Sequence, residues 1–208
     1  MAQRFVLAVC GYRRSGKDTI CNYISTHYQF AHLKFATPLK DMIKAGFGFS
    51  DEQLEGDAKD LIDSNLGVSP RTVMQFIGTE VMQFQIQNII PGIGRSFWTK
   101  RLCDSIKLHI GNNTSVVISD LRFLHEYDAI KSLCSSLSCE LKVIRVERPS
   151  LQIQDQHISE LEWIQIPHDV TIINDTDVTN IHQQTDMFFN ILKKSAEIQI
   201  NNNNNNNK

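Results

Sequence analysis

The sequence predicts an α/β fold with a mainly parallel central sheet of about five strands flanked by helices. Short runs rich in β-branched residues alternate with helical patterns along the chain, and this alternation is typical of a parallel sheet covered on both faces. The first run, FVLAVC at 5–10, contains no polar residue. A strand of that kind is expected to be buried on both faces.

The other strands are predicted from similar runs. SVVIS, LKVIRV and VTII combine β-branched residues with the length of an ordinary strand. Together with the first run and the shorter HLKFA, they place strands at 5–10, 32–36, 115–119, 141–146 and 170–173.

Helices are predicted between these strands from apolar spacing and from helix start signals. Pro38 follows Thr37 and Pro70 follows Ser69, so each hydroxyl residue is expected to be the N-cap of a helix that begins at proline. The interval 37–114 contains no predicted strand, and we expect a helical region inserted over the sheet edge there. The predicted helices span 16–28, 38–46, 70–88, 96–109, 122–135 and 179–195.

The composition fits one soluble domain. The chain has 208 residues, of which 41% are hydrophobic and 21% charged. No apolar run is long enough to cross a bilayer, and the N-terminus does not have the pattern of a signal peptide. Five cysteines form no C-x-x-C pair, which favours reduced thiols in the cytoplasm. We expect a folded domain at 1–196 and a disordered asparagine-rich tail at 197–208, because NNNNNNNK has nothing apolar to bury.

The charge is distributed unevenly. Residues 1–50 have a net charge of +5, and the remainder has −7. A basic N-terminal quarter on an acidic body favours a local anionic ligand over a general nucleic-acid surface.

A glycine-rich stretch, GYRRSGKDT at 11–19, lies between the first strand and the first helix. It is close to the pattern G-x-x-x-x-G-K-[ST], in which backbone N–H groups and a helix N-terminus hold phosphate. Gly11 and Gly16 allow the backbone to curl, and Lys17 is expected to reach the β- and γ-phosphates. The stretch therefore predicts a phosphate-binding loop.

Asp18 occupies the position at which GTPases have the hydroxyl that binds Mg²⁺. The chain has neither N-K-x-D nor D-x-x-G, which argues against a GTPase. Adenylate kinases also lack that hydroxyl and have a threonine one residue later, which is Thr19 here. The pattern favours a small-molecule kinase, in which phosphates and water hold much of the metal. Asp18 and Thr19 are the expected protein contribution to the Mg²⁺ site.

Several motifs in order resemble the deoxynucleoside monophosphate kinases of bacteriophages and large DNA viruses. The resemblance covers nearly the whole chain apart from the tail. The motifs are GYRRSGKDT, FATPLKDM (35–42), SPRTVMQFIGTE (69–80), FWTKRL (97–102), VVISDLRFLHEYDAI (116–130) and DVTIINDTD (169–177).

The resemblance implies transfer of the γ-phosphoryl group of ATP to a deoxynucleoside 5′-monophosphate, with Mg²⁺, giving the diphosphate and ADP. It implies the P-loop kinase fold, with a helical substrate-binding region and a lid. Small-molecule nucleotides would be the partners, with no nucleic acid and no membrane, and a homodimer is left open. The expected location is the cytoplasm, that of the host if the protein is viral.

Lys17, Asp120 and Arg122 are the expected catalytic residues. Asp120 and Arg122 end a buried strand, where a carboxylate can orient the metal and an arginine can neutralise the moving phosphoryl group. Asp120 is equally suited to capping the following helix. The segment 148–163 is the expected lid or its hinge, and His157 and Glu160 within it are given no role. The expected ATP-binding residues are Gly11, Arg14, Ser15, Gly16, Lys17, Asp18, Thr19 and Arg148.

Arg71 is the expected ligand of the acceptor's 5′-phosphate, because arginine binds phosphate through two parallel hydrogen bonds. Lys40 is expected at the carboxyl edge of the sheet, with a solvated helix face as the alternative. Gln75 and Thr79 could contact base or sugar, and Trp98 could stack on a base or pack in the core. The full set expected around the acceptor is Phe35, Lys40, Arg71, Gln75, Thr79, Trp98, Asp120, Arg122 and Glu126.

Two other hypotheses remain open at this point. One keeps the reaction class but changes the acceptor to phosphomevalonate or dephospho-coenzyme A, since animal-type phosphomevalonate kinases share the SGKD loop. The other is a nucleotide-binding module without transfer activity. A mere sensor needs fewer cations around one site, so the arginines weigh against it; they are Arg13, Arg14, Arg71, Arg122 and Arg148.

Overall fold

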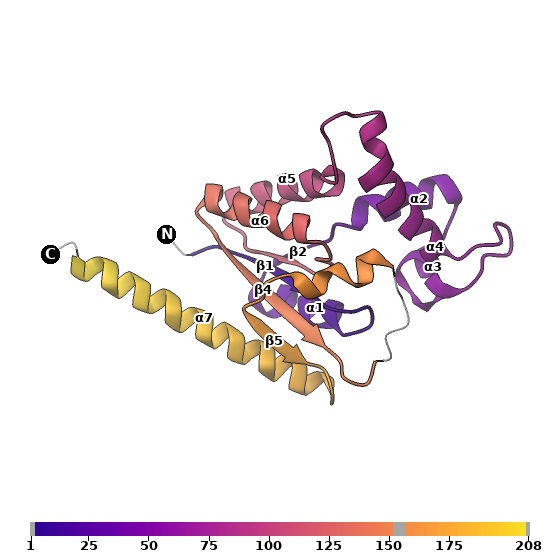
Figure 1. Ribbon diagram of the computed structural model, residues 1–208. Helices are drawn as coiled ribbons and strands as arrows, with labels where there is room; N and C mark the ends of the chain where they lie inside the picture. Colours follow the sequence, from indigo (N-terminus) through magenta and orange to yellow (C-terminus); the bar gives the residue numbers. More distant parts are fainter. Residues whose placement is uncertain (1–2, 152–156, 207–208) are drawn as a thin grey trace.

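The computed structural model describes residues 3–151 and 157–206, with side chains up to Ser195. Within these residues the strands form a five-stranded sheet in the order β2-β3-β1-β4-β5, and every pairing is parallel (Figure 1). The predicted fold class is therefore confirmed. The strands are β1 (Phe5–Cys10), β2 (Ala31–Leu33), β3 (Val116–Ile118), β4 (Glu140–Glu147) and β5 (Val170–Ile173).

Strand β1 is central and buried on both faces. Its Val6 is in register with Val116 of β3 and with Leu141 of β4. Because successive side chains of a strand point to opposite faces, Val6 and Ala8 enter one core cluster while Leu7 and Val9 enter the other. This double burial is the physical reason for the absence of polar residues in FVLAVC.

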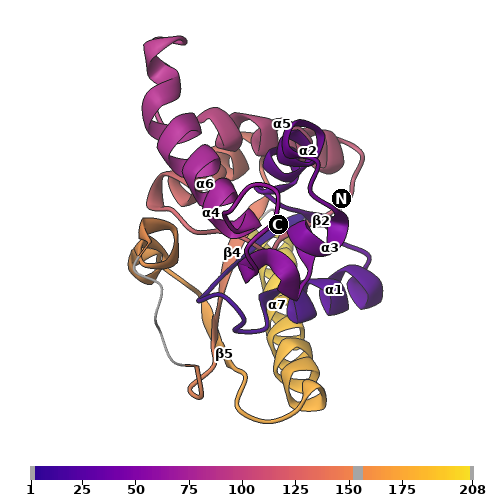
Figure 2. The same ribbon diagram turned by 90° about the vertical axis from the view of Figure 1, so that its right-hand side faces the viewer.

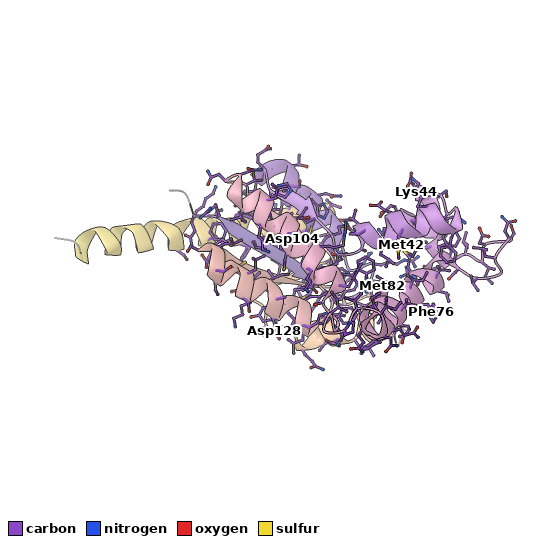
Figure 3. All side chains as sticks on the ribbon, turned by 90° about the horizontal axis from the view of Figure 1, so that it is seen from above. Met42, Lys44, Phe76, Met82, Asp104 and Asp128 are labelled. Atoms are coloured by element: carbon purple, nitrogen blue, oxygen red, sulfur yellow. The ribbon has the colours of Figure 1, made fainter. Side chains whose placement is uncertain are left out.

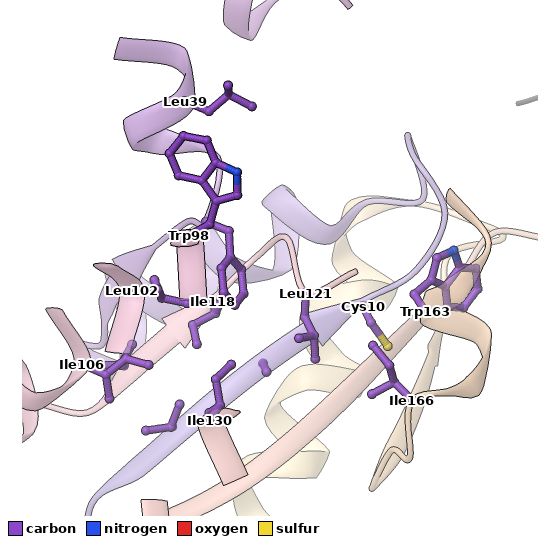
Figure 4. Close-up of a cluster of buried hydrophobic side chains, with 14 of the residues drawn as sticks. Cys10, Leu39, Trp98, Leu102, Ile106, Ile118, Leu121, Ile130, Trp163 and Ile166 are labelled. Carbon is purple, nitrogen blue, oxygen red and sulfur yellow. The ribbon is translucent and has the colours of Figure 1, made fainter. Parts of the chain in front are cut away.

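Helices cover both faces of the sheet. One face packs against α1 (Lys17–Tyr28) and the first part of α7 (Val178–Asn206), and the other against α5 (Phe97–Gly111) and α6 (Leu124–Leu137). Figure 4 shows the second cluster, in which Ile106 of α5 and Ile130 of α6 lie over the strands.

The sheet order reverses at its centre. The chain passes from β1 across β3 to β2, and later from β3 across β1 to β4. Ligands of open parallel sheets bind at such a reversal, beyond the carboxyl ends of the strands. The glycine-rich loop follows β1 there, and Asp120 follows β3.

The interval between β2 and β3 is helical, as predicted, and its part before α5 projects from one side of the sheet (Figures 2 and 3). The elements α3 and η1 were not predicted, although Ser50 and Gln53 form a capping box at the start of α3. The elements are α2 (Thr37–Phe47), α3 (Asp51–Glu55), η1 (Asp57–Asp60), α4 (Pro70–Gln75), η2 (Phe76–Gln85), η3 (Ile86–Asn88) and the start of α5.

The predicted helix 70–88 is a continuous helical segment that consists of three helix types in succession. It begins as the α-helix α4, widens into the π-helix η2 and ends as the 3-10 turn η3. Gly78 in η2 lies against α2, where a Cβ would meet the Leu39 Cδ2 at 2.5 Å. The Gly78 carbonyl also accepts a hydrogen bond from Trp98 Nε1 at 2.9 Å. Packing on both sides thus accompanies the wide turn, and such turns are frequent at functional sites.

One local expectation needs correction. The N-cap of α2 is Ala36, and Thr37 is already the first helical residue; Ser69, in contrast, caps α4 as predicted by accepting from Thr72 N. The backbone of α7 continues to Asn206, and the disorder expected at 197–208 stays a prediction. Once a helix has nucleated, each added residue gains a hydrogen bond, so a polar segment can extend a packed helix.

Candidate active site

The glycine-rich loop has the geometry that its glycines were expected to provide. Gly11 has φ 144° and Gly16 has φ 106°, a region that side chains with a Cβ rarely adopt. A Cβ on Gly11 would lie 2.3 Å from Val146 O, and one on Gly16 would lie 2.6 Å from Asn174 Nδ2. The loop ends at the N-terminus of α1, so unpaired N–H groups and the positive helix end face the same place.

Lys17 is buried beneath this loop. Its Nζ donates to Gly11 O at 2.9 Å and to Tyr12 O at 2.7 Å. Burial, followed by the nearby charge of Arg122, lowers the pKa of Lys17 to about 8. An amine so weakly solvated gains much from an incoming phosphate, which would raise its pKa and replace backbone carbonyls as its partner.

Two clefts open on either side of Lys17. One has a volume of about 450 Å³ and the other about 550 Å³. Arg14, Lys17 and Asp18 line both. The loop therefore separates two ligand-sized spaces that meet at the lysine.

The first cleft lies between the loop, the end of β3 and the inserted helices. Every residue that the sequence assigned to the acceptor lines it: Phe35, Lys40, Arg71, Gln75, Thr79, Trp98, Asp120, Arg122 and Glu126. Trp98 lines the cleft, and it is also a core residue that is only 7% exposed. Packing in the core and stacking on a base are therefore compatible for this residue.

The second cleft lies between the loop and the segment after β5. Of the expected ATP-binding residues it includes Gly16, Thr19 and Arg148. Gly11 and Ser15 shape the loop itself, and the Ser15 carbonyl accepts from Asn174 Nδ2 at 2.8 Å. Sequence reasoning gave no role to the other residues that line this cleft, which are Asn174, Thr176, Asp177, Val178 and Ile181. The polar residues that directly follow the buried strand β5 were a usable signal for them.

Asp60 pairs with arginines from two elements that border the first cleft, the glycine-rich loop and α4. This residue was not predicted at the site from the sequence. Its Oδ1 lies 2.5 Å from Arg71 Nε and 3.4 Å from Arg13 Nη1, and its Oδ2 lies 3.4 Å from Arg14 Nη2. The hydrogen bond from Arg71 is the main cause that lowers the pKa of Asp60. Arginines from the loop and from α4 thus converge on one carboxylate, which is the arrangement that a phosphate would also satisfy.

Two lysines of the first cleft, Lys34 and Lys40, are paired with carboxylates in the same way. Lys40 Nζ lies 2.6 Å from Glu55 Oε2, and Lys34 Nζ lies 2.7 Å from Asp18 Oδ1. Lys34 was not expected at the site. Burial alone would raise the pKa of Asp18, but the hydrogen bond and charge of Lys34 lower it on balance.

Asp120 binds the backbone that leads into α2. Its Oδ1 accepts from Phe35 N and its Oδ2 from Ala36 N, both at 2.9 Å. These groups precede α2, so Asp120 fixes the start of α2 against the end of β3. Among the described residues, the hydrogen bonds of the Asp120 side chain go to this backbone and not to α6, which was the alternative expected, and the carboxylate lines the cleft.

Glu126 is a buried carboxyl at the inner end of the first cleft. It is 3% exposed, and its Oε2 accepts from Arg122 N at 3.0 Å and Phe123 N at 3.1 Å. Burial is the main cause that raises the pKa of Glu126 to about 8. A neutral carboxyl can both donate and accept, which suits contact with a base or a sugar.

The described part of the expected lid is fastened to the body of the protein. Residues 152–156 of that segment lie outside the described residues. After them, Arg145 Nη2 donates to Ile164 O at 2.9 Å and Ile166 O at 3.0 Å, and Glu162 Oε2 pairs with Arg95 Nη2 at 3.3 Å. Within this stretch, Ser159 and Glu160 line the first cleft.

Within residues 3–151 and 157–206, no cluster of three metal-binding side chains of the histidine, cysteine or carboxylate type is present. In the same part of the chain, no helix combines the length and apolar character that a membrane span requires.

Two solved kinase structures resemble this architecture. A gluconokinase from Sinorhizobium meliloti has a TM-score of 0.51 and 11% identity, covering 96% of this chain and 99% of its own. The dephospho-CoA kinase of Campylobacter jejuni has a TM-score of 0.50 and 12% identity, covering 93% and 99%. The chain therefore has the P-loop kinase fold.

The family follows from sequence comparison. The model of the deoxynucleotide monophosphate kinase family matches residues 52–185. A protein of Acanthamoeba polyphaga mimivirus named "Putative deoxynucleotide monophosphate kinase" is 32% identical over 185 residues, covering 86% of this chain and 93% of its own. The chain belongs to the deoxynucleotide monophosphate kinase family.

Proposed function

We propose that this kinase transfers the γ-phosphoryl group of ATP to the 5′-phosphate of a deoxynucleoside monophosphate. The observation that carries the proposal is the pair of clefts that meet at Lys17. The cleft between the loop and the segment after β5 would hold ATP. The cleft beneath the inserted helices, with Arg71 and Glu126, would hold the acceptor.

Phosphoryl transfer needs alignment and charge neutralisation more than covalent chemistry. An oxygen of the acceptor's 5′-phosphate forms a bond to the γ-phosphorus. The bond from that phosphorus to the β,γ-bridging oxygen breaks, and its electron pair stays with ADP. Lys17 lines both clefts and Arg122 lines the first, so their charges would stabilise the equatorial oxygens during transfer.

The residues present also suit Mg²⁺. Asp18 and Thr19 offer a carboxylate and a hydroxyl in the first turn of α1, and the Asp18 side chain is 66% exposed although it pairs with Lys34. Oxygen ligands together with water are what Mg²⁺ prefers. The ion would supply charge neutralisation at the β- and γ-oxygens.

An ADP-release assay with ATP, Mg²⁺ and a panel of acceptors tests the proposal. The panel contains the four deoxynucleoside monophosphates, their ribo forms, phosphomevalonate and dephospho-coenzyme A. We expect ADP release with at least one deoxynucleotide above the rate without acceptor. Release with phosphomevalonate or dephospho-coenzyme A alone would reassign the acceptor. No release above background with any acceptor would favour a binding module.

A further inference from the structure

Glu160 is a buried carboxylate whose two oxygens have different partners. It is 1% exposed and ends the 3-10 turn η4 (Ile158–Glu160). Its Oε1 accepts from Arg122 Nη1, and its Oε2 accepts from the backbone N–H of Arg13 at 3.1 Å. One side chain therefore joins the arginine beyond β3 to the phosphate-binding loop.

The backbone around Glu160 is fixed. The Glu160 carbonyl accepts from Trp163 Nε1 at 2.9 Å, and Glu160 N donates to His157 O at 2.8 Å. The carbonyl of Ser159 accepts from Arg122 Nη1 at 3.0 Å. The arginine is thus held by a side chain and by a carbonyl of the same turn.

Both of these contacts use Nη1. Among the described residues, the hydrogen bonds of the Arg122 guanidinium go to Ser159 and Glu160 through that atom. The remaining N–H groups of the planar fork are available to the cleft, which Arg122 lines beside Lys17.

Burying an ion pair seldom adds stability, because removing both charges from water costs more than an apolar packing of equal volume. Fixing a long arginine side chain before the reaction, in contrast, removes the entropy that would otherwise be lost in the transition state. A buried Glu160 beside the transfer site is better explained by orientation than by fold stability.

We propose that Glu160 is a positioning residue that holds the Arg122 guanidinium against the loop, ready to contact the transferring phosphoryl group. The inference rests on the proposed function for the identity of the acceptor. In this proposal, the role of the stretch 157–166 is to link the backbone of the phosphate-binding loop to Arg122.

A double-mutant cycle tests the link. We expect Glu160→Gln to lower kcat by about ten- to hundred-fold, with the KM values of both substrates changed less than about three-fold. If Glu160 acts through Arg122, then Arg122→Ala and the double variant should have the same kcat. Glu140→Gln is the matched control, because it neutralises a carboxylate paired with Lys142 at the amino end of β4.

Two results would overturn the inference: a kcat of Glu160→Gln within about two-fold of wild type, or losses that multiply in the double variant, which would place the effect in the Arg13 contact. If Glu160→Gln does not fold, Glu160→Asp keeps the charge but withdraws it by one methylene. It is expected to bind ATP normally with a reduced kcat, and a wild-type kcat would refute the role.

Running the same cycle on ATP hydrolysis without acceptor separates the two proposals. A wild-type protein that hydrolyses ATP but transfers to no deoxynucleotide would refute the proposed acceptor. The cycle on hydrolysis would still decide whether Glu160 works through Arg122.

Discussion

Replacing Arg71 by alanine tests the acceptor side of the site most directly. In the free protein its Nε lies 2.5 Å from Asp60 Oδ1, and 21% of its side chain is exposed. If Arg71 binds the acceptor's 5′-phosphate, the variant loses a charge-assisted hydrogen bond, which is worth roughly 1.5–3 kcal/mol, or about ten- to hundred-fold in affinity. Because phosphate must replace or share Asp60, the exchange offsets part of this gain. The expected rise in the acceptor KM is about ten-fold.

The assay varies each substrate at saturation of the other. The acceptor KM should rise far more than the ATP KM, and kcat should also fall because the attacking oxygen is less well aligned. Arg71→Lys should restore only part of the activity, since lysine supplies charge without the planar fork. Arg101→Ala, an exposed arginine of α5 outside both clefts, is the control. Equal and small changes in both KM values would refute the assignment, and a selective rise in the ATP KM would move Arg71 to the donor side.

Five further outcomes are expected. Lys17→Ala should lower kcat by orders of magnitude with an unchanged circular dichroism spectrum, because the lysine charge stabilises the transition state most. In the wild-type protein, kcat/KM for ATP should fall as pH rises through about 8, where free Lys17 loses its proton. Because the pKa of Glu126 is raised in the folded protein, its contribution to stability is fully present below the ordinary value of 4.5 and is lost as pH rises through about 8. Glu126→Gln cannot ionise, so the melting temperature of this variant should fall less than that of wild type between these two pH values. Asn174→Ala removes the hydrogen bond to Ser15 O and should raise the ATP KM about three- to ten-fold, with the acceptor KM as the internal control. Deleting 201–208 should leave melting temperature and activity unchanged, since an asparagine tract has nothing apolar to bury.

The sheet and the first cleft could be predicted because their signals are local. The run FVLAVC, the glycine spacing of the loop and the Ser69-Pro70 cap each depend on neighbouring residues. Parallel strands then bring the ends of β1 and β3 to one edge, so residues on separate motifs arrive in one cleft. The π-helix could not be predicted, because the packing of Gly78 against Leu39 accompanies the wide turn and no helical period encodes it.

The counter-charges of the site could not be predicted for a related reason. Arg13 N meets Glu160 across 147 positions and Arg71 meets Asp60 across 11, and no spacing rule joins such residues. Glu160 was noticed only as part of a segment, and Asp60 and Lys34 were not noticed at all. Periodicity tells which face of an element is buried, but it does not tell which distant carboxylate completes the pair.

These pairs change what the basic N-terminal quarter means. Its cleft cations already have partners: Lys34 with Asp18, Lys40 with Glu55, and Arg13 and Arg14 with Asp60. A cluster of bare cations would repel itself in the free protein, whereas paired cations are held in place and partly neutral. If these cations bind the nucleotide, we expect phosphate to replace carboxylate at cations that are already fixed. Such an exchange gives lower affinity than unpaired charges would. The cations are already positioned when the nucleotide arrives, however, and in-line transfer depends on that positioning.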